Sequence, residues 1–368
     1  MGVKSCLRFW PYARGMVKRP SYRIGWAASL TGRLAPFLCA TLLGATLFGA
    51  GLSASSAWAV PDRVSVNAME YPWSAIGKIE TSIGHCSGFL IGKKHVLTAA
   101  HCLYDRESNR WIKTSEIRFT AGYQNQERSI TSPVKRYKQS RKYEKTSEAS
   151  VKNTLTDWAL LELALPLGQD AGWLALRRLD QSLLQDLAEG NATLFHAGYR
   201  GDDPDHLKAG FGCRIAGYFK HGIGIAHRCS IMRGDSGSPL LVFTHGEIFA
   251  TGVHVIGASD GDQEIAGALS VSVFHPDKGS ARAARILRPA GNIWRGSKPP
   301  RSNSKAEKAP TDTIDLLLGE LGYLRGQGRN ASPSSRRSAI QAFLKDAHLS
   351  GPARPSVSLL GELLRKLN

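Results

Sequence analysis

The hydrophobic positions between residues 60 and 280 come in short runs of about strand length, separated by glycine, asparagine, aspartate and proline. Helical periodicity is weak in this region, apart from residues 179–187. Short strands with turn residues between them are typical of antiparallel sandwiches and barrels. The pattern therefore predicts a mainly β domain. Its clearest strand-length runs are residues 75–79, 88–91, 95–98, 159–163, 239–243, 247–255 and 268–273.

One polar segment interrupts this pattern. Residues 128–150 contain few hydrophobic side chains and many basic ones. Such a run of like charges is normally solvated rather than packed into a core, so we expect a surface loop there. The basic cluster comprises Lys135, Arg136, Lys138, Arg141, Lys142 and Lys145.

The pattern changes again toward the C-terminus. Residues 296–311 contain no apolar side chain larger than proline or alanine and cannot build a core, so residues 281–311 are predicted to be a basic linker. Hydrophobic residues then recur at helical spacing in three stretches, which predicts a small three-helix module over residues 312–368. The stretches are marked by Ile314, Leu317, Leu318, Leu321 and Leu324, by Ile340, Phe343, Leu344 and Ala347, and by Leu359, Leu360, Leu363 and Leu364.

The first 59 residues have the layout of a secretory signal. A basic stretch ends at Arg33, an apolar run covers residues 34–50, and small residues lead to Ala59, after which we expect cleavage. An uncleaved anchor helix is the alternative, but the apolar run of about 17 residues is at the short limit for crossing a bilayer. We therefore expect an exported protein, either secreted or periplasmic.

The formal net charge of +18 is concentrated at the two ends of the chain. Residues 1–59 carry seven basic and no acidic residues, and residues 281–368 carry 16 basic and six acidic ones. Residues 60–280 carry 25 basic and 24 acidic residues and are nearly neutral. The basic tail would attract anionic partners such as cell-wall or envelope polymers, with no specific recognition of nucleic acid. A solvated helical appendage is the alternative.

Removal of the signal would also remove Cys6 and Cys39 and leave four cysteines, Cys86, Cys102, Cys213 and Cys229. An even number in an exported chain predicts two disulfides. Four cysteines allow three pairings, of which the local one joins Cys86 to Cys102 and Cys213 to Cys229. Buried free thiols are the alternative. A metal site is disfavoured because no Cys-x-x-Cys spacing occurs.

The clearest candidate chemistry lies in residues 234–239, Gly-Asp-Ser-Gly-Ser-Pro, which place Ser236 between two glycines. A serine hydroxyl attacks a carbonyl only if a nearby base takes its proton. His101 is the candidate base, and Asp157 is the carboxylate that would hold the imidazole and stabilise its charged form. The backbone N–H groups of Gly234 and Ser236 would bind the oxyanion that develops. No metal or cofactor is expected.

Three motifs together resemble the chymotrypsin-like (trypsin-fold) serine proteases. They are Thr-Ala-Ala-His-Cys at residues 98–102, Asp-Trp-Ala-Leu-Leu at 157–161 and the serine motif at 234–239. The resemblance covers residues 60–280 and implies two antiparallel six-stranded β-barrels with the active site between them. It also implies that Cys86 and Cys102 form the family disulfide beside the histidine. Ser238 and the stretch at residues 71–78 are similar to the bacterial branch that contains the glutamyl endopeptidases.

The same resemblance addresses substrate preference. His254 matches a histidine that helps to bind an acidic side chain in glutamyl endopeptidases, and Arg233 would add positive charge. Those enzymes carry a threonine where this chain has Ile231, so acidic preference remains open. A trypsin-like preference for Lys or Arg is disfavoured, because Ser230 stands where those enzymes carry an aspartate.

The resemblance raises two further questions. Many relatives become active when a new N-terminus is released, and a cut after Arg63 would expose Val64. Residues 313–367 weakly resemble the three-helix peptidoglycan-binding domains of bacterial wall enzymes, with a different turn at residues 325–337.

The sequence thus predicts a serine endopeptidase that acts on proteins or peptides through an acyl-enzyme intermediate, tethered to the envelope by its tail. The alternative is a catalytically inactive protease-fold protein that binds the envelope.

Overall fold

The computed structural model describes residues 63–125, 129–145, 151–260, 263–274, 310–324 and 331–367. The predicted signal at residues 1–59, with Cys6 and Cys39, lies outside the described residues, and so do residues 281–309 of the predicted linker. Within the described ranges, no helix is both long enough and apolar enough to cross a membrane.

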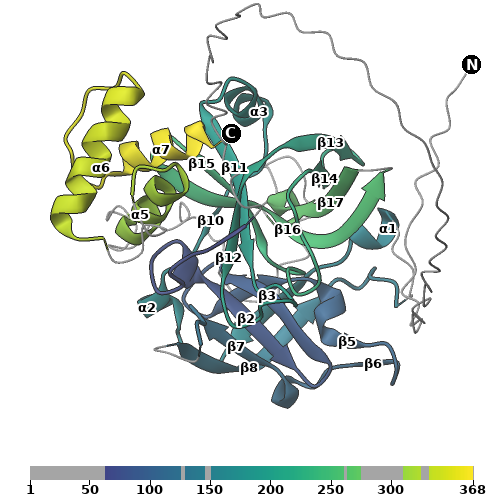
Figure 1. Cartoon of the computed structure of the whole chain (residues 1–368). Coiled ribbons are helices and arrows are strands. Elements are labelled where there is room, and N and C mark those ends of the chain that lie inside the picture. The colour runs from purple at the N-terminus through teal and green to yellow at the C-terminus, as the bar shows by residue number, and fades with distance from the viewer. Residues whose placement is uncertain are drawn as a thin grey trace, which may run out of the picture. The chain divides into compact units, whose positions relative to one another are not determined.

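The first half of the β domain is a closed antiparallel barrel of six strands (Figure 1). Phe89, Phe119 and Leu161 are fully buried in its core. In barrel order the strands are β2 (Ile76–Thr81), β3 (Gly84–Leu90), β4 (His95–Thr98), β9 (Ala159–Leu163), β8 (Ile130–Gln139) and β7 (Arg118–Ala121).

Strand β8 lies in the segment that was expected to be a surface loop, so that expectation was wrong for Ile130–Gln139. The strand closes the barrel by pairing with β7 on one side and β9 on the other. Ser132 and Val134 are buried, whereas Lys135 and Arg136 are exposed. The basic side chains therefore occupy the outer face of a strand whose other face is buried, which an antiparallel sheet accommodates.

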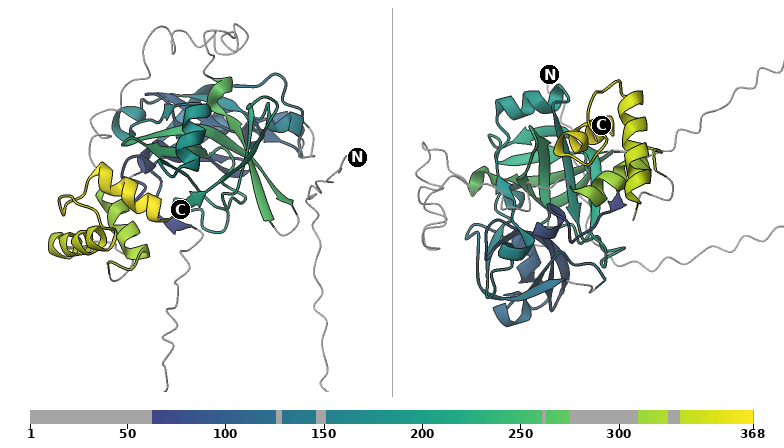
Figure 2. Two further views of the ribbon diagram at one scale, coloured as in Figure 1. Left: turned by 90° about the horizontal axis from the view of Figure 1, so that it is seen from above. Right: turned by 90° about the vertical axis from the view of Figure 1, so that its left-hand side faces the viewer.

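The second half of the β domain is a nine-stranded sheet that curls without closing (Figures 1 and 2). The mainly β, two-part architecture is confirmed, but this part has more strands than the expected six. The short strand β1 begins the hydrogen-bonded path, and β10 pairs with β16 beside it. In order the strands are β1 (Val64–Ser65), β12 (Lys208–Cys213), β11 (Ala192–Gly198), β15 (Pro239–Thr244), β16 (Glu247–Asp260), β17 (Gln263–Ser270), β14 (Gly224–His227) and β13 (Ile215–Phe219), with β10 at Ala175–Leu176.

Short helices connect these strands. The helical periodicity at residues 179–187 corresponds to α3 (Gln181–Ala188), whose first turn is capped by the Asp180 carboxylate accepting the Leu183 N–H at 3.0 Å. Leu183 is fully buried against the second sheet. The remaining short elements are η1 (Trp73–Ala75), η2 (Ala100–Leu103), β5 (Tyr104–Asp105), β6 (Arg110–Trp111), η3 (Thr114–Glu116), α1 (Val151–Thr154), α2 (Gly168–Ala171) and η4 (Val271–Val273).

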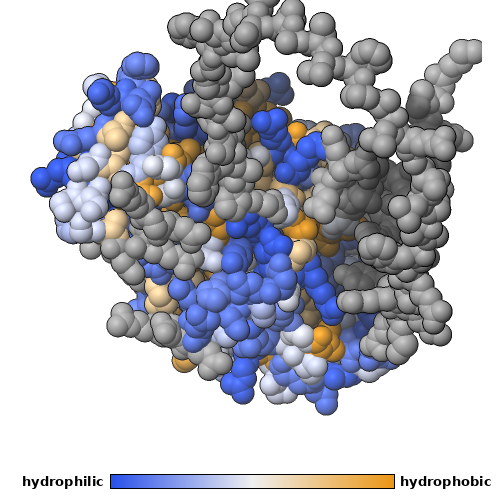
Figure 3. Space-filling model, viewed as in Figure 1, coloured by the Kyte–Doolittle hydropathy of each residue, from blue (hydrophilic) through white to orange (hydrophobic). Residues whose placement is uncertain are grey.

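The three predicted C-terminal helices are present as α5 (Thr311–Glu320), α6 (Pro333–Asp346) and α7 (Val357–Lys366). Serine side chains cap the last two, because Ser332 accepts the N–H of Ser335 and Ser356 accepts that of Leu359. The helices bury most of their hydrophobic positions, and α5 also buries Thr313 and Asp315. Exposed polar residues cover much of α6, as the hydrophilic surface in Figure 3 shows.

These helices pack against the β domain. Trp73 Nε1 donates to Thr313 Oγ1 at 2.7 Å, and Glu70 accepts the backbone N–H of Thr313 at 3.0 Å. A Cβ placed on Gly361 of α7 would lie 2.7 Å from the Phe243 ring, so helix and sheet are in close contact. The buried leucines of α5 and α7 belong to the same hydrophobic cluster as the six-stranded barrel.

Candidate active site

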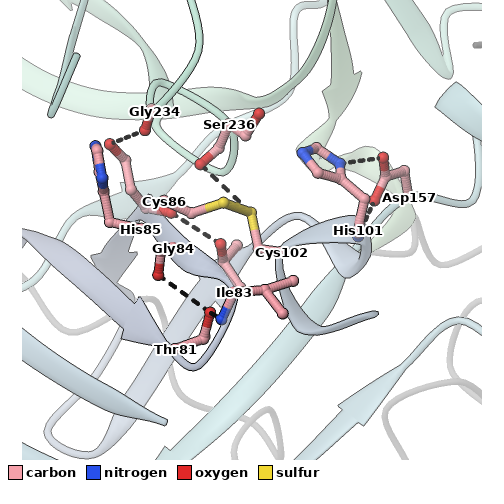
Figure 4. Close-up of a disulfide and its surroundings, with 12 residues drawn as sticks. Thr81, Ile83, Gly84, His85, Cys86, His101, Cys102, Asp157, Gly234 and Ser236 are labelled. Carbon is pink, nitrogen blue, oxygen red and sulfur yellow. Dashed lines mark hydrogen bonds and ion pairs between the residues drawn. A yellow bond between two sulfur atoms is a disulfide. The ribbon is translucent and has the colours of Figure 1, made fainter. Parts of the chain in front are cut away.

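His101 and Asp157 lie at the same end of two paired strands. His101 follows β4 on the short helix η2, and Asp157 precedes β9, which pairs with β4 through Thr98 and Ala159. The His101 Nδ1 atom is 2.7 Å from Asp157 Oδ2, and the His101 backbone N–H donates to Asp157 Oδ1 at 2.9 Å (Figure 4). One carboxylate therefore fixes both the ring and the backbone of the histidine.

The residue after the aspartate anchors it. Trp158 is buried, and its ring packs edge-on against Phe274 with centroids 5.3 Å apart. Asp157 itself is only 6% exposed. Burial on one side and two hydrogen bonds to His101 on the other leave the carboxylate little freedom to turn away.

The loop that carries Ser236 depends on two glycines with positive φ, +96° at Gly234 and +82° at Gly237. The space around both glycines also leaves no room for a side chain. A Cβ on Gly234 would lie 2.2 Å from Tyr199 O, and one on Gly237 would lie 2.1 Å from Thr98 Oγ1. The glycines that flank the serine thus allow its loop to lie directly against the barrel.

Ser87 on β3 joins this loop to both sheets, and no motif in the sequence identifies it as part of the site. Its hydroxyl donates to Gly234 O at 2.9 Å and accepts the Tyr199 N–H at 2.8 Å. Its backbone N–H donates to Ser236 O at 2.9 Å. Ser87 is fully buried, so these bonds are shielded from water. The serine loop is therefore fastened to the barrel that carries His101.

Both predicted disulfides are present, Cys86–Cys102 and Cys213–Cys229. The first lies between the histidine and the serine loop, with Cys102 Sγ 3.8 Å from Ser236 O (Figure 4). Among the described residues, the Ser236 hydroxyl makes no hydrogen bond. The structure thus joins His101 directly to Asp157 and places Ser236 beside them through its backbone. The hydrogen bond between a nucleophile and its general base often tightens only when substrate binds.

Comparison with known proteins decides the family, because the sequence profile described as Trypsin matches residues 62–276. This chain belongs to the trypsin family. A glutamyl endopeptidase of Bacillus licheniformis is 33% identical over 142 residues, which are 38% of this chain and 41% of that relative. The match therefore spans less than half of the relative's length.

Two solved structures resemble the trypsin-family chain. A Glu endopeptidase in complex with MPD aligns with a TM-score of 0.48 and 19% identity, covering 62% of this chain and 95% of that one. The protease Anisep from Arthrobacter nicotinovorans aligns with a TM-score of 0.42 and 18% identity, covering 56% and 93%.

His254 of the trypsin-family chain is buried behind the serine loop. Its Nδ1 atom is 2.9 Å from the Ser238 hydroxyl, and its backbone O accepts the Gly237 N–H at 2.7 Å. Its ring lies 4.7 Å from that of His227 and 5.2 Å from that of His196. Sequence reasoning missed these two partners, because they lie on β14 and β11 and only strand pairing brings them together.

All three histidines are fully buried, and desolvation lowers their pKa values, that of His227 to about 3 and those of His196 and His254 well below the usual value. The imidazoles are therefore neutral at pH 7. Nε2 of each ring lacks a hydrogen-bond partner among the described residues.

The other predicted pocket residues lie on the segment before the serine. Ile231 is half-buried beside β16, where a Cβ on Gly257 would lie 3.8 Å from its Cγ1. Arg233 is exposed, and its backbone O accepts the Gly201 N–H at 2.7 Å. Ser230 is half-buried. The structure thus brings His254 close to the serine loop and leaves Arg233 at the surface.

Among the residues that the structure describes, two groups have the composition of a metal site, Cys86 with His101 and Cys102, and His227 with Cys229 and His254. Their cysteines are all in disulfides, so they offer no thiolate. Neither group fits the donor set of a structural zinc site.

Proposed function

We propose that this chain is a serine endopeptidase with Ser236 as nucleophile, His101 as general base and Asp157 as the orienting carboxylate. The observation that carries the proposal is the pair of hydrogen bonds from His101 to Asp157. Because Asp157 engages Nδ1, the Nε2 atom is the one free to take a proton from the serine. Membership of the trypsin family and the similarity to a glutamyl endopeptidase support the same reading.

The reaction would proceed in two steps. Ser236 Oγ attacks the peptide carbonyl carbon while its proton passes to His101 Nε2, and the carbonyl oxygen becomes an oxyanion bound by the N–H groups of Gly234 and Ser236. The C–N bond then breaks, and His101 returns the proton to the leaving amine. A water molecule then attacks the acyl-enzyme with the same help from His101, which releases the acid and regenerates the serine.

Replacement of the nucleophile tests this proposal. Ser236→Ala should lower peptide hydrolysis by about 10⁶-fold, since removal of the nucleophile leaves only the residual effect of the binding site. Ser182→Ala removes a hydroxyl from an exposed serine on α3 and should keep full activity. Equal hydrolysis by Ser236→Ala and wild type would refute the assignment of the nucleophile.

The rival proposal is a catalytically inactive protein that binds the envelope. Casein clearing by the purified wild type, with both disulfides confirmed by mass spectrometry, distinguishes the two. Clearing that is lost in Ser236→Ala supports the enzyme. A silent wild type with intact disulfides supports the rival.

We also propose a preference for substrates with an acidic residue before the cleaved bond. The similar relative is named a glutamyl endopeptidase, and His254 is bonded to Ser238, two residues from the proposed nucleophile. A neutral imidazole N–H can donate a hydrogen bond to a carboxylate.

Paired peptides that differ only by Glu or Gln before the cleaved bond test the preference. We expect at least about tenfold higher kcat/KM for the Glu peptide, from one additional charge-assisted hydrogen bond. His254→Gln should reduce that ratio while labelling of Ser236 by a fluorophosphonate continues. Equal rates on the two peptides would contradict the proposed preference.

Export and attachment complete the proposed function. The signal-like pattern at residues 1–59 and the two disulfides support export.

Attachment to anionic wall polymers stays a prediction based on the basic tail. The helices α5 to α7 pack on the protease domain, so their deletion would expose buried surface of that domain. Charge reversal is therefore a cleaner test of wall attachment than deletion. Arg337→Glu with Lys345→Glu changes two exposed residues of α6 and should weaken retention on isolated walls without loss of activity. Unchanged retention would contradict attachment through this helix.

A further inference from the structure

The carboxylate directly before the proposed nucleophile is buried and paired with a distant cation. Arg63 Nη1 donates to Asp235 Oδ2 across 172 residues of sequence, and the two side chains are 1% and 0% exposed. A charge taken out of water in this way is very unfavourable unless its partner remains beside it. Asp235 therefore depends on Arg63 as the partner of its buried carboxylate.

Arg63 is itself held by backbone carbonyls of two neighbouring strands. Its Nη2 donates to Lys208 O at 2.6 Å on β12 and to Gly198 O at 3.3 Å at the end of β11. The planar guanidinium thus reaches three acceptors in one fixed orientation, which a lysine ammonium cannot reproduce in full.

Asp235 in turn shapes the loop that supplies the oxyanion donors. Its Oδ2 accepts the Met232 N–H at 2.9 Å, and its backbone N–H donates to Met232 O at 3.0 Å. Its backbone O accepts the Ser238 N–H at 2.9 Å. These bonds fold residues 232–238 into the turn that presents the N–H groups of Gly234 and Ser236.

The chain enters the sheet immediately after Arg63. Val64 pairs with Ala209 on β12, and the Val66 N–H donates to Leu207 O at 3.1 Å. A cut between Arg63 and Val64 would leave the guanidinium on the released piece. The cation that neutralises Asp235 is the Arg63 side chain, which a cut at this bond would remove.

We propose that Arg63 is a positioning residue for the Ser236 loop, and that the active enzyme keeps the Arg63–Val64 bond. This inference rests on the proposed function, since it concerns the loop that carries the nucleophile. Loss of the guanidinium would leave Asp235 unpaired, and the turn that holds the oxyanion donors would open.

Labelling by a small fluorophosphonate tests the proposal on the full exported chain, because the reaction needs the serine and the oxyanion donors but little of the substrate pocket. Arg63→Ala should label at least about 100-fold more slowly, comparable to the loss of an oxyanion donor. For a short peptide, kcat should fall more than KM rises. Arg63→Lys should recover part of the rate, and added guanidinium ion should partly rescue Arg63→Ala.

Arg336 offers a matched control for stability alone. It forms an ion pair with Asp315 of α5, where the side chains are 17% and 2% exposed, and it does not contact the serine loop. Arg336→Ala should unfold at a lower temperature yet label at the wild-type rate well below that temperature. If Arg63→Ala behaved in the same way, Arg63 would be merely structural and the proposal would be overturned.

The outcomes separate the two proposals. An unlabelled wild type would refute the proposed function, whereas a labelled wild type with normally labelled Arg63→Ala would refute only the role of Arg63. Intact-mass analysis of the labelled wild type tests the uncut bond. We expect labelled chains that still contain Arg63, and labelled chains that begin at Val64 would contradict the proposal.

Discussion

At the scale of single residues, the site combines side chains that carry the chemistry with side chains that hold them. His101, Asp157 and Ser236 were predicted from their motifs, because a Ser-His-Asp set can be recognised by its functional groups in unrelated folds. Ser87 and Arg63 were not predicted as parts of the site. A serine within a strand and an arginine before a strand have no distinctive sequence pattern. The partners of Ser87 and Arg63 also lie far away in the sequence.

Ser87 provides the first residue-scale prediction. Ser87→Ala removes the hydroxyl that bridges Gly234 O and the Tyr199 N–H and leaves both groups buried without a partner. We expect kcat to fall about tenfold through displacement of the serine loop, together with a loss of about 1–3 kcal/mol in stability. Steady-state kinetics and urea unfolding measure the two effects. Ser334→Ala on the exposed face of α6 is the control and should change neither. A normal kcat in Ser87→Ala would show that the loop does not need this bridge.

The buried histidines predict how stability depends on pH. Their pKa values are lowered in the folded chain, so below about pH 6.5 the unfolded state binds more protons than the folded one. Stability is therefore fully present above pH 6.5 and falls as the pH drops toward the folded-state pKa of about 3 for His227.

Urea unfolding between pH 7 and pH 4 measures this effect. Each histidine that stays neutral contributes a slope of about 1.4 kcal/mol per pH unit. His227→Gln should reduce the slope by about that amount, whereas replacement of the exposed His221 by Gln should leave it unchanged. An unchanged slope in His227→Gln would mean that His227 takes up its proton in the folded state.

At the scale of elements, the pattern of hydrophobic residues predicted seven of the 17 described strands and all three C-terminal helices. It failed at β8, where basic residues lie on the outer face of a barrel strand. Half of such a strand is solvated, so its composition is close to that of a loop, and only pairing with β7 and β9 settles its structure. Periodicity showed that α5 to α7 have apolar faces, but the surface that covers those faces is set by tertiary contacts.

The contact between α5 and the protease domain gives an element-scale prediction. Thr313 is buried, and its hydroxyl accepts from Trp73 Nε1 and donates to Glu70. Thr313→Val keeps the shape but removes the hydroxyl, and it should lower the free energy of unfolding by about 1–3 kcal/mol. Single-transition unfolding, followed both by tryptophan fluorescence and by circular dichroism, would show that helices and barrel unfold together. Separate transitions would mean that the module is an independent domain.

At the scale of the whole molecule, the protease domain can be viewed as two sheets joined through a few buried polar contacts. Ser87 links the closed barrel to the serine loop, and Arg63, directly before β1, links the nine-stranded sheet to the same loop. The first disulfide joins β3 to the helix that carries His101. The proposed nucleophile is therefore supported from both sheets, although its own hydroxyl is free to meet a substrate.

In the proposed mechanism, Ser236 is the nucleophile activated by His101 and Asp157. Treatment of the purified chain with a fluorophosphonate, followed by peptide mass spectrometry to map the adduct, tests this directly. We expect one adduct per chain, on Ser236, with labelling slowed about 10⁴-fold by Asp157→Asn, which leaves the imidazole in the wrong tautomer. No adduct, an adduct on another residue, or labelling unaffected by Asp157→Asn would contradict it.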